Sequence, residues 1–353
     1  MNPWCNRGKI ILLIVVIAVS SLNCYLLKQG IYILDYNRKA VDIDSMLRDS
    51  SDNAKLVEFL ETVKEIRRYA TDSVGLKKNK NYYKYVKTDR DYLVNVLSAC
   101  DKTSFNQYQW CFPLFGCVPY KGFFEKKDAE REARKLSAKE KDVNIDEVDA
   151  FSTLGILSDP IYSFMQSYSI YGLASLILHE QTHATIFIKN QVRFNEEAAS
   201  FIGTQGAINF IKSKYGENSE QYKNIFLAQA DYETYVSSLR KLYQELKSVY
   251  DSKVYTKEMK LAEKEKIINA YKEYISRNYD SLFKTQRYKR IEKAKINNAF
   301  LSVRMTYSMN LDLFTKLYVK NNSDLKATVA YLKSLKKVKS KDIEKIIESE
   351  VNK

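Results

Sequence analysis

The clearest hydrophobic pattern of the chain lies just before residue 180 and predicts an amphipathic α-helix. Its apolar positions recur three and four residues apart, the spacing of one buried face; they are Ile170, Leu173, Ala174, Ile177 and Leu178. Neither Gly nor Pro interrupts the five residues that follow Leu178. We therefore expect a buried or half-buried helix that continues through residue 183.

A second pattern, farther along the chain, predicts a pair of long helices. Spacings of three and four alternate, as in heptads, at Tyr232, Tyr235, Leu239, Leu242, Leu246 and Val249. The segment Asp251–Thr256 interrupts the pattern, and another charged helical stretch follows, with apolar positions at Leu261, Ile268, Tyr271, Ile275 and Leu282. We predict an antiparallel helical hairpin over about residues 221–285, whose apolar stripe serves packing rather than partner binding.

Composition is consistent with a mainly α-helical fold that contains a small β element. The 353 residues are 45% hydrophobic and 13% aromatic, and they include only 10 Gly and 4 Pro. Residues 28–335 are expected to form the main domain. Within it, residues 28–75 are expected to be helical, and residues 76–165 to mix turns with short helices, one of them at Lys126–Lys139. Residues 336–353, rich in Lys and Glu, predict a charged terminal helix or tail.

The N-terminal residues 1–27 predict an export signal or a membrane anchor. Arg7 and Lys9 precede an uncharged run from Ile10 to Leu27, which is at the short end of what spans a bilayer. Positive charge before such a run favours a cytoplasmic N-terminus, with the rest of the chain outside. Cys24 is a candidate lipid-attachment site, and an uncleaved transmembrane anchor is the alternative. Both interpretations predict a membrane-tethered protein on the outer side of a cytoplasmic membrane.

Charge does not add a nucleic-acid partner to this picture. The net charge of +14 makes nucleic acid a possible ligand, because its phosphates are negatively charged. However, the Lys residues are scattered among Glu along helical faces, and no zinc-finger, helix-turn-helix or aromatic RNA-binding motif accompanies them. We therefore expect no nucleic-acid binding.

The chain has only two histidines, His179 and His183, and both belong to one HExxH motif. On a helix, residues four apart share a face, so both imidazoles can point at one metal ion. Glu180 projects beside them, where it can reach a metal-bound water, as in zinc metallopeptidases. The alternative is a helix with two hydrogen-bonded histidines and no metal.

Glu196 is the expected third ligand of a zincin-like core over residues 166–212. The sequence Phe194-Asn195-Glu196 resembles the Asn-Glu pair of gluzincins, in which a Glu on a second helix completes a His₂Glu set and water takes the fourth position. The segment Lys189–Arg193 is the expected turn between the two helices. Glu197 would face about 100° away, so we expect it to be solvated or to support the site. Small residues on the stripe of Glu196 predict close helix packing; they are Ser200, Gly203 and Ala207.

Three cysteines follow the N-terminal segment, and two of them lie in the most aromatic stretch, which we expect to be an ordered loop. Cys111 and Cys117 enclose five residues within Trp110–Phe124, a spacing that suits a small disulfide loop in an oxidising compartment. We predict this pairing, with Cys100 as a competing partner or a free thiol. No further Cys or His is left to complete a second metal site.

Motifs in a fixed order resemble the family of predicted aminopeptidases found as bacterial envelope lipoproteins, which are HExxH proteins of gluzincin type. The similarity covers roughly residues 24–335, and the matching segments are Trp110–Phe124, 150–160, His179–Ala184, Phe194–Glu196 and Asn297–Leu301 with Tyr307. The resemblance implies a Zn²⁺-dependent aminopeptidase in the cell envelope, with its catalytic domain on the periplasmic side of a bacterial membrane. It also favours Cys24 as a lipidation site.

The other similar segments supply candidates for substrate binding. Asp159 ends a turn before Pro160 that is either structural or an edge strand over the zinc for a peptide substrate. Asn297 and Asn298 are poor helix formers inside a helical run, so we expect them to bond buried backbone or a bound peptide, or to position a residue of the catalytic helix. Arg304 and Tyr307 are candidates, by resemblance and position, for the donor that stabilises the reaction's oxyanion.

The predicted mechanism assigns one role to each motif residue. Zn²⁺ held by His179, His183 and Glu196 lowers the pKa of its water, and Glu180 takes the proton as that water attacks a peptide carbonyl. Two alternatives have other functions: an envelope protein that binds zinc or peptide without hydrolysis, and a metal-free membrane-anchored helical scaffold.

Overall fold

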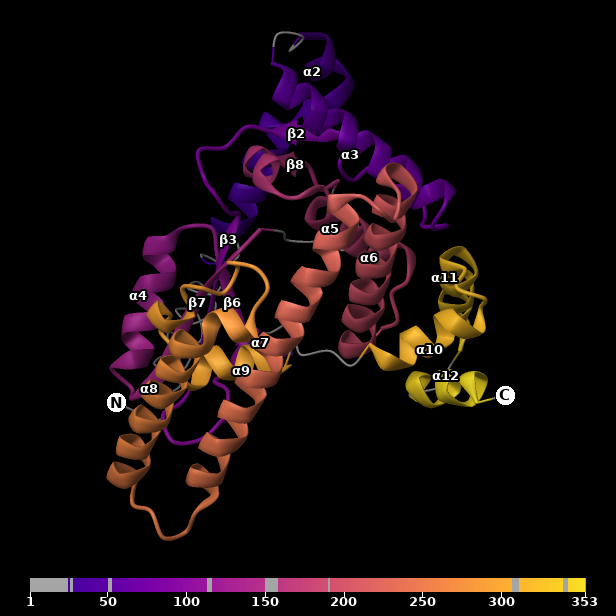
Figure 1. The fold of residues 1–353 in the computed structure, drawn as a ribbon. Coiled ribbons are helices and arrows are strands. Elements are labelled where there is room, and N and C mark those ends of the chain that lie inside the picture. The colour runs from indigo at the N-terminus through magenta and orange to yellow at the C-terminus, as the bar shows by residue number, and fades with distance from the viewer. Residues whose placement is uncertain are drawn as a thin grey trace, which may run out of the picture.

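The computed structural model describes residue 25 and residues 28–49, 53–112, 116–149, 158–189, 191–306, 311–338 and 342–352. Helices predominate and the sheets are small, which confirms the prediction of a mainly α-helical chain (Figure 1). Cys24 and nearly all of the predicted signal or anchor lie outside the described residues. Within the described part, no helix is both long enough and apolar enough to cross a membrane.

A layer of helices and a three-stranded sheet forms one end of the molecule. Helical residues 28–39 lead into α2 and α3, and Asn53 caps α3 by accepting a hydrogen bond from the Leu56 amide at 3.1 Å. The strand order is β1-β2-β8, with β1 antiparallel and β8 parallel to β2. The elements are β1 (Val41–Asp42), α2 (Ile43–Asp49), α3 (Ala54–Asp72), β2 (Lys84–Val86), β8 (Ile161–Tyr162) and the 3₁₀ turn η1 (Ser163–Ser167).

A second, antiparallel sheet has the strand order β6-β3-β7 and packs against helix α4. The expectation of short helices and turns over residues 76–165 was therefore wrong for most of the described part, although α4 lies where the charged helix was expected. Strand β3 is buried on both faces, so it lacks the alternation that marks a half-buried strand. These elements are β3 (Val94–Asp101), β6 (Tyr120–Phe123), α4 (Lys126–Ser137) and β7 (Lys141–Val148).

The aromatic stretch expected to be a loop contains a two-stranded ribbon. Strands β4 (Trp110–Phe112) and β5 (Gly116–Val118) are antiparallel, and Cys111 lies opposite Cys117. A disulfide joins these two cysteines, while Cys100 is a buried free thiol. The disulfide thus links the two strands of the ribbon to each other. Residues 113–115, which connect the strands, lie outside the described residues.

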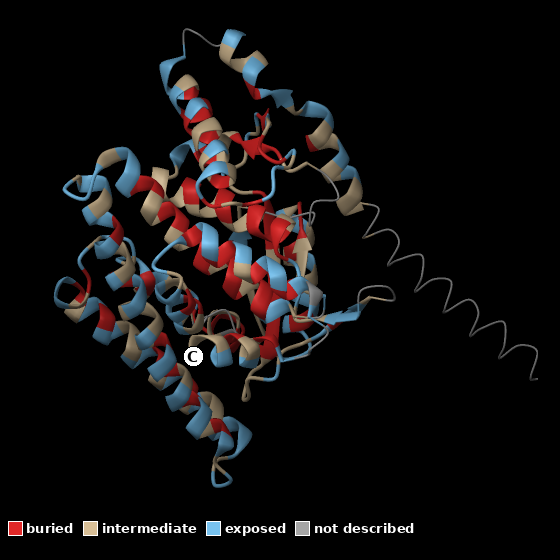
Figure 2. Ribbon diagram, turned by 90° about the vertical axis from the view of Figure 1, so that its right-hand side faces the viewer, coloured by how far each residue is buried: buried red, intermediate tan, exposed pale blue. Residues whose placement is uncertain are grey.

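Two adjacent helices, α5 (Ile170–Thr185) and α6 (Val192–Tyr215), form the centre of the fold. Figure 2 shows buried residues concentrated along them. One apolar cluster includes Leu173 and Ile177, and a second apolar cluster includes Leu178 and Phe194. The second cluster also contains residues of α10 (Asp312–Lys320), α11 (Leu325–Ser334) and α12 (Ile343–Val351). Two apolar clusters therefore fix the α5–α6 pair.

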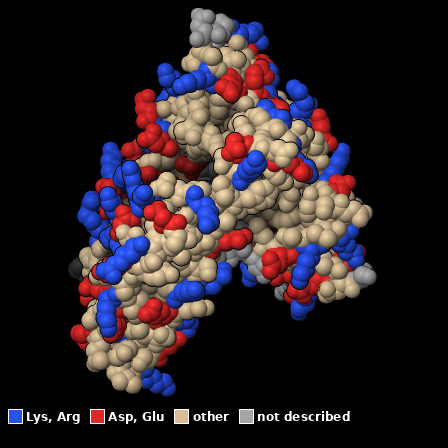
Figure 3. Space-filling model, viewed as in Figure 1, with Lys and Arg blue, Asp and Glu red and all other residues tan. Residues whose placement is uncertain are grey.

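Helices α7 (Glu220–Asp251) and α8 (Lys257–Leu282) form a long hairpin that projects from the rest of the molecule (Figure 1). Ser219 and Thr256 cap the first turns of these helices with their hydroxyl oxygens. The shared apolar core includes Leu239, Leu242, Leu246, Ile268 and Ile275. On the face drawn in Figure 3, Lys and Arg atoms are interspersed with Asp and Glu atoms.

Helix α9 (Asn298–Thr306) fastens the hairpin to the second sheet. The Asn298 amide donates to the carbonyls of Asp101, Lys102 and Ser104 at 2.8–3.1 Å, and its oxygen accepts from the Tyr250 hydroxyl at 2.8 Å. Asn298 is fully buried, at 0% exposure. Its hydrogen bonds therefore join α9, the end of β3 and α7.

We predict that Asn298→Ala lowers the free energy of unfolding by about 2–4 kcal/mol. The substitution leaves buried carbonyls and a tyrosine hydroxyl without partners, and each such group costs about 1–3 kcal/mol. Urea unfolding followed by circular dichroism measures the change. The matched control is Asn269→Ala at an exposed position of α8, which should stay within about 0.5 kcal/mol of the parent. Equal midpoints for the two variants would contradict this role.

Candidate metal centre

Helix α5 presents both histidines on one face. Its first turn is capped by Ser169, whose hydroxyl accepts from the Gly172 amide at 3.1 Å, and the helix continues without interruption to Thr185. The Nε2 atoms of His179 and His183 lie 3.2 Å apart. The His183 side chain is 6% exposed and that of His179 is 23% exposed. The imidazoles thus converge at the edge of the core, with one side still open to solvent.

Helix α6 brings the Glu196 carboxylate to this pair. One carboxylate oxygen lies 3.6 Å from His179 Nε2, and the other lies 3.6 Å from His183 Nε2. One ligand atom from each residue can be chosen such that all three lie within 4.8 Å of one another. The three residues predicted as a His₂Glu set therefore form one cluster, built from two adjacent helices.

Gly203 permits the close approach of the two helices at this point. A Cβ atom on Gly203 would lie 2.8 Å from the Ser175 carbonyl oxygen and 3.1 Å from His179 Cβ. Real side chains do not fit at such distances, so any larger residue would push α6 away from α5. Since Gly203 lies two turns after Glu196 on the same stripe, the distance from the carboxylate to the imidazoles depends on this contact.

Asn195 fixes the turn between α5 and α6. Its amide nitrogen donates to the Ile188 carbonyl at 2.8 Å, and its oxygen accepts from the Ile188 amide at 2.9 Å. The side chain is buried, at 3% exposure. No role was assigned to Asn195 from the sequence, although its place next to Glu196 was a usable signal. It locks the turn and thereby sets where α6 begins.

Two further polar contacts support the cluster. The Ser200 hydroxyl lies 3.4 Å from Nδ1 of His179, so it can fix the ring orientation and leave Nε2 as the atom that faces Glu196. Glu197 is buried and accepts a hydrogen bond from Arg193 Nε at 2.9 Å. Glu197 thus takes a supporting position on α6, away from the histidines.

Electrostatics favour the metal-binding protonation states of two of the residues. Burial lowers the pKa of His183, and the nearby His179 lowers it further, while the charge of Glu196 acts in the opposite direction. The pKa remains lowered, which favours the neutral imidazole. Burial acts to raise the pKa of Glu196, but the hydrogen bond from His179 and the charges of both imidazoles outweigh it and leave this pKa lowered. A neutral imidazole beside a carboxylate is the donor set that Zn²⁺ takes.

The spacing of the cluster matches the size of a zinc coordination sphere. Bonds of about 2.0–2.2 Å at tetrahedral angles place neighbouring ligand atoms about 3.4 Å apart. The three closest separations among the described ligand atoms are 3.2, 3.6 and 3.6 Å. The residues therefore fit Zn²⁺ with little movement.

Asp159 lies two residues before strand β8. Its backbone amide donates to Asn81 Oδ1 at 3.2 Å, and its carbonyl accepts from the Tyr82 amide at 2.7 Å. Burial first, and then the charges of Glu180 and Asp159, raise the pKa of Tyr82. The charges of Glu180 and Asp159 therefore both act on Tyr82. Among the described strands, β8 lies at an edge of its sheet.

The remaining predicted residues are not brought to the cluster by their contacts. Asn297 donates to the Val143 carbonyl at 3.0 Å and accepts from the Phe300 amide at 3.0 Å. Arg304 bonds Asp146 at 3.0 Å and stacks on Phe300. With Asn298, these residues connect α9 to β3 and β7, and their role in substrate binding stays a prediction. Tyr307 lies outside the described residues.

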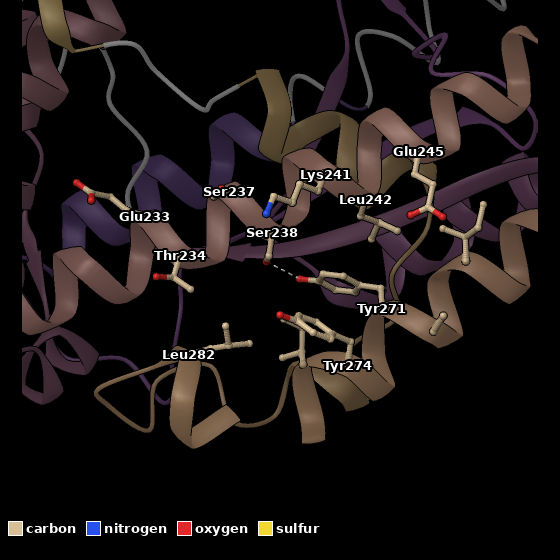
Figure 4. A pocket seen from close by; sticks show the side chains of 13 residues that line it. Glu233, Thr234, Ser237, Ser238, Lys241, Leu242, Glu245, Tyr271, Tyr274 and Leu282 are labelled. Atoms are coloured by element: carbon tan, nitrogen blue, oxygen red, sulfur yellow. Dashed lines mark hydrogen bonds between the residues drawn. The ribbon is translucent and has the colours of Figure 1, made fainter. Parts of the chain in front are cut away.

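A separate groove of about 600 Å³ opens between α7 and α8. Figure 4 shows Tyr271 and Tyr274 on one side facing Ser238 and Lys241 on the other, with a hydrogen bond of 2.9 Å between Ser238 and Tyr271. None of its lining residues belongs to α5 or α6. The groove is thus formed by the hairpin alone and is not part of the candidate metal centre.

Comparison of the sequence with protein families matches residues 24–347 to a family described as "Putative aminopeptidase". The match includes the His179–Glu196 region, the disulfide ribbon and the whole helical hairpin. No curated protein and no solved structure matches the chain. The family assignment therefore depends on the sequence over most of the length of the chain.

We predict that Gly203→Ala loosens the candidate metal centre. The added methyl group must displace α6 from α5, which should lower the free energy of unfolding by about 1–3 kcal/mol and weaken zinc binding. Urea unfolding and competition with a chromogenic zinc chelator measure the two effects.

The matched control for this substitution is Gly30→Ala. A Cβ at Gly30 has no neighbour within 4 Å, so this variant should bind zinc like the parent and unfold at the same denaturant concentration or a slightly higher one. Parental zinc affinity in Gly203→Ala would show that the close helix contact does not determine the ligand geometry.

Proposed function

The chain belongs to the "Putative aminopeptidase" family, and on this premise we propose that it is a zinc-dependent peptidase that removes residues from the amino terminus of peptides. The observation that supports this proposal most directly is the cluster of His179, His183 and Glu196, with ligand atoms at the separations that zinc requires. Glu180, between the two histidines in the chain, supplies a carboxylate outside that set. A site with three ligands and a separate carboxylate suits hydrolysis rather than structural metal binding.

The reaction needs a base for water and an acid for the leaving amine. Zinc, when bound, would lower the pKa of a coordinated water and polarise the peptide carbonyl. Glu180 is half-buried on α5, one position after His179, where it can take a proton from the attacking water. The same carboxyl group can then deliver that proton to the nitrogen of the broken peptide bond. One residue thus performs both proton transfers.

Removal of single residues also requires recognition of the substrate's ammonium group. Asp159 and Glu197 are two carboxylates that could hold this group, and their surroundings favour Asp159. The charges of Asp159 and Glu180 both act on Tyr82, and Glu197 is bonded to Arg193 on its own helix. We infer that Asp159 pairs with the ammonium of the substrate.

The proposed location is the outer side of a bacterial cytoplasmic membrane. The Cys111–Cys117 disulfide supports it, because such bonds persist in oxidising compartments. The N-terminal sequence supports a tether, through either lipidated Cys24 or an uncleaved anchor. The substrate would then be a peptide in the periplasm.

We predict that Glu180→Gln lowers kcat at least about a hundredfold and leaves one zinc ion bound per chain. The amide cannot accept the proton from water, while the three ligands are unchanged. Steady-state kinetics on a peptide substrate and zinc analysis of the same sample provide the two values. A variant that hydrolyses peptides at the parental rate would exclude Glu180 as the base.

We also predict that Glu196→Gln weakens zinc binding more than about a hundredfold, since loss of a ligand should exceed the roughly 10–100-fold cost of removing a supporting residue. Glu197→Gln is the matched control, one position along α6. Its zinc affinity should fall by no more than the roughly 10–100-fold expected for a supporting residue. Competition with a chelator measures both affinities. If the control lost zinc and Glu196→Gln retained it, the assignment of the third ligand would be wrong.

Pairs of peptides with free and acetylated amino termini distinguish exopeptidase from endopeptidase activity. We expect single residues to be released from the free peptides only, because acetylation removes the ammonium that Asp159 would pair with. Mass spectrometry of the products gives the cleavage site. Internal cleavage of both peptides would support an endopeptidase, and zinc binding without cleavage of a mixed peptide library would contradict the proposed hydrolysis.

A further inference from the structure

Tyr82 has a backbone conformation that bulky residues seldom adopt. Its φ is 59°, in the left-handed region, although it is neither Gly nor Asn. Its side chain is buried, with only 3% of the residue exposed. Such a conformation persists only when the surrounding structure imposes it, and it is often found at functional sites.

Three hydrogen bonds impose this conformation. The Tyr82 amide donates to the Asp159 carbonyl at 2.7 Å, and the Tyr82 carbonyl accepts from Arg67 Nη1 at 3.1 Å. The neighbouring Asn81 side chain accepts from the Asp159 amide at 3.2 Å. Residues 81 and 82 are thus fastened directly to the segment that contains Asp159, just before strands β2 and β8 begin.

The same part of the chain is attached to the helix that contains the HExxH motif. The Lys77 amide donates to Thr185 Oγ1 at 2.9 Å, near the end of α5. Tyr82 belongs to the same apolar cluster as Ile177 of α5. Glu180 lies three positions after Ile177 and therefore on the same face of that helix. Residues 77–82 are consequently attached to α5 at Thr185 and share an apolar cluster with Ile177.

The Tyr82 hydroxyl is placed as a donor. Within the described residues, the hydrogen bonds of Tyr82 are made by its backbone and its hydroxyl makes none. Burial and the nearby charges of Glu180 and Asp159 raise its pKa, so the hydroxyl keeps its proton at neutral pH. Both neighbouring carboxylates are acceptors. The group therefore offers an O–H to the region where a substrate carbonyl would be attacked.

The proposed reaction needs such a donor. When water attacks the carbonyl, negative charge develops on the carbonyl oxygen, and a fixed hydrogen-bond donor there lowers the barrier. Neither histidine is available, because both belong to the metal cluster. Arg304, one earlier candidate, is bonded to Asp146 and stacked on Phe300.

We propose that the Tyr82 hydroxyl donates a hydrogen bond to the oxygen of the scissile carbonyl as that oxygen becomes negatively charged. This inference rests on the proposed peptidase function and adds a catalytic residue to it. Tyr82 does not transfer its proton, and Glu180 performs both proton transfers. The strained backbone holds the donor in place before the substrate binds, so no reorganisation is required during the reaction.

The test compares Tyr82→Phe with the parent and with Tyr162→Phe. The first variant should lower kcat about 10²–10³-fold, with KM within a few-fold and zinc content unchanged. Tyr162 is the matched control: it is also buried, in the adjacent strand β8, and its pKa is raised by burial and then by Asp159 and Tyr36, without Glu180. Tyr162→Phe should retain kcat within about threefold. Equal rates for both variants would overturn the role of Tyr82.

Binding of a phosphinic dipeptide gives a readout that does not require turnover. Its tetrahedral anionic group resembles the attacked carbonyl, whereas a free amino acid does not. By calorimetry, Tyr82→Phe should weaken binding of the phosphinic dipeptide about 10–100-fold and leave binding of the amino acid unchanged. Loss of both affinities, or of neither, would overturn the proposal. If the parent cleaves no peptide, the proposed function fails, and this titration alone decides the role of Tyr82.

Discussion

The contact between α5 and α6 at Gly203 is the constraint on which the candidate site depends. The absence of a side chain there lets the backbone of α6 meet Ser175 and His179 at distances that exclude even a methyl group. Glu196 lies two turns before this contact and is therefore brought to the two imidazoles. Gly206, one turn farther along, repeats the arrangement against Leu178. A metal centre made from only two helices requires this close packing, because each helix supplies ligands from one face.

The rest of the fold keeps that helix pair rigid. Two apolar clusters include residues of both helices, and Asn195 closes the turn between the helices with a pair of hydrogen bonds to Ile188. The segments that precede β2 and β8 are joined to each other by hydrogen bonds between residues 81–82 and Asp159, and Lys77 in the first of them bonds Thr185 of α5. The helical hairpin and α9 are fastened to the second sheet, so they do not supply the metal ligands.

Features that depend on local spacing could be predicted from the sequence. The two histidines share a helical face because they are four residues apart, and Glu196 could be preferred over Glu197 because of the small residues on its stripe. Features that depend on distant partners could not. Strand β3 lacks alternation because it is buried on both faces. The Asn298 amide donates hydrogen bonds to carbonyls almost 200 residues earlier in the chain, and the Tyr82 amide donates to the carbonyl of Asp159, which lies in the segment before β8. No period in the sequence indicates such pairings.

A crystal structure of the zinc-loaded protein would test whether His179, His183 and Glu196 form one zinc site. Anomalous scattering at the zinc absorption edge locates the ion independently of the protein atoms. We expect one strong peak about 2.0–2.2 Å from both Nε2 atoms and from a Glu196 carboxylate oxygen, with a position open toward Glu180. No peak at these three residues, or a peak coordinated by Glu197 instead of Glu196, would contradict it.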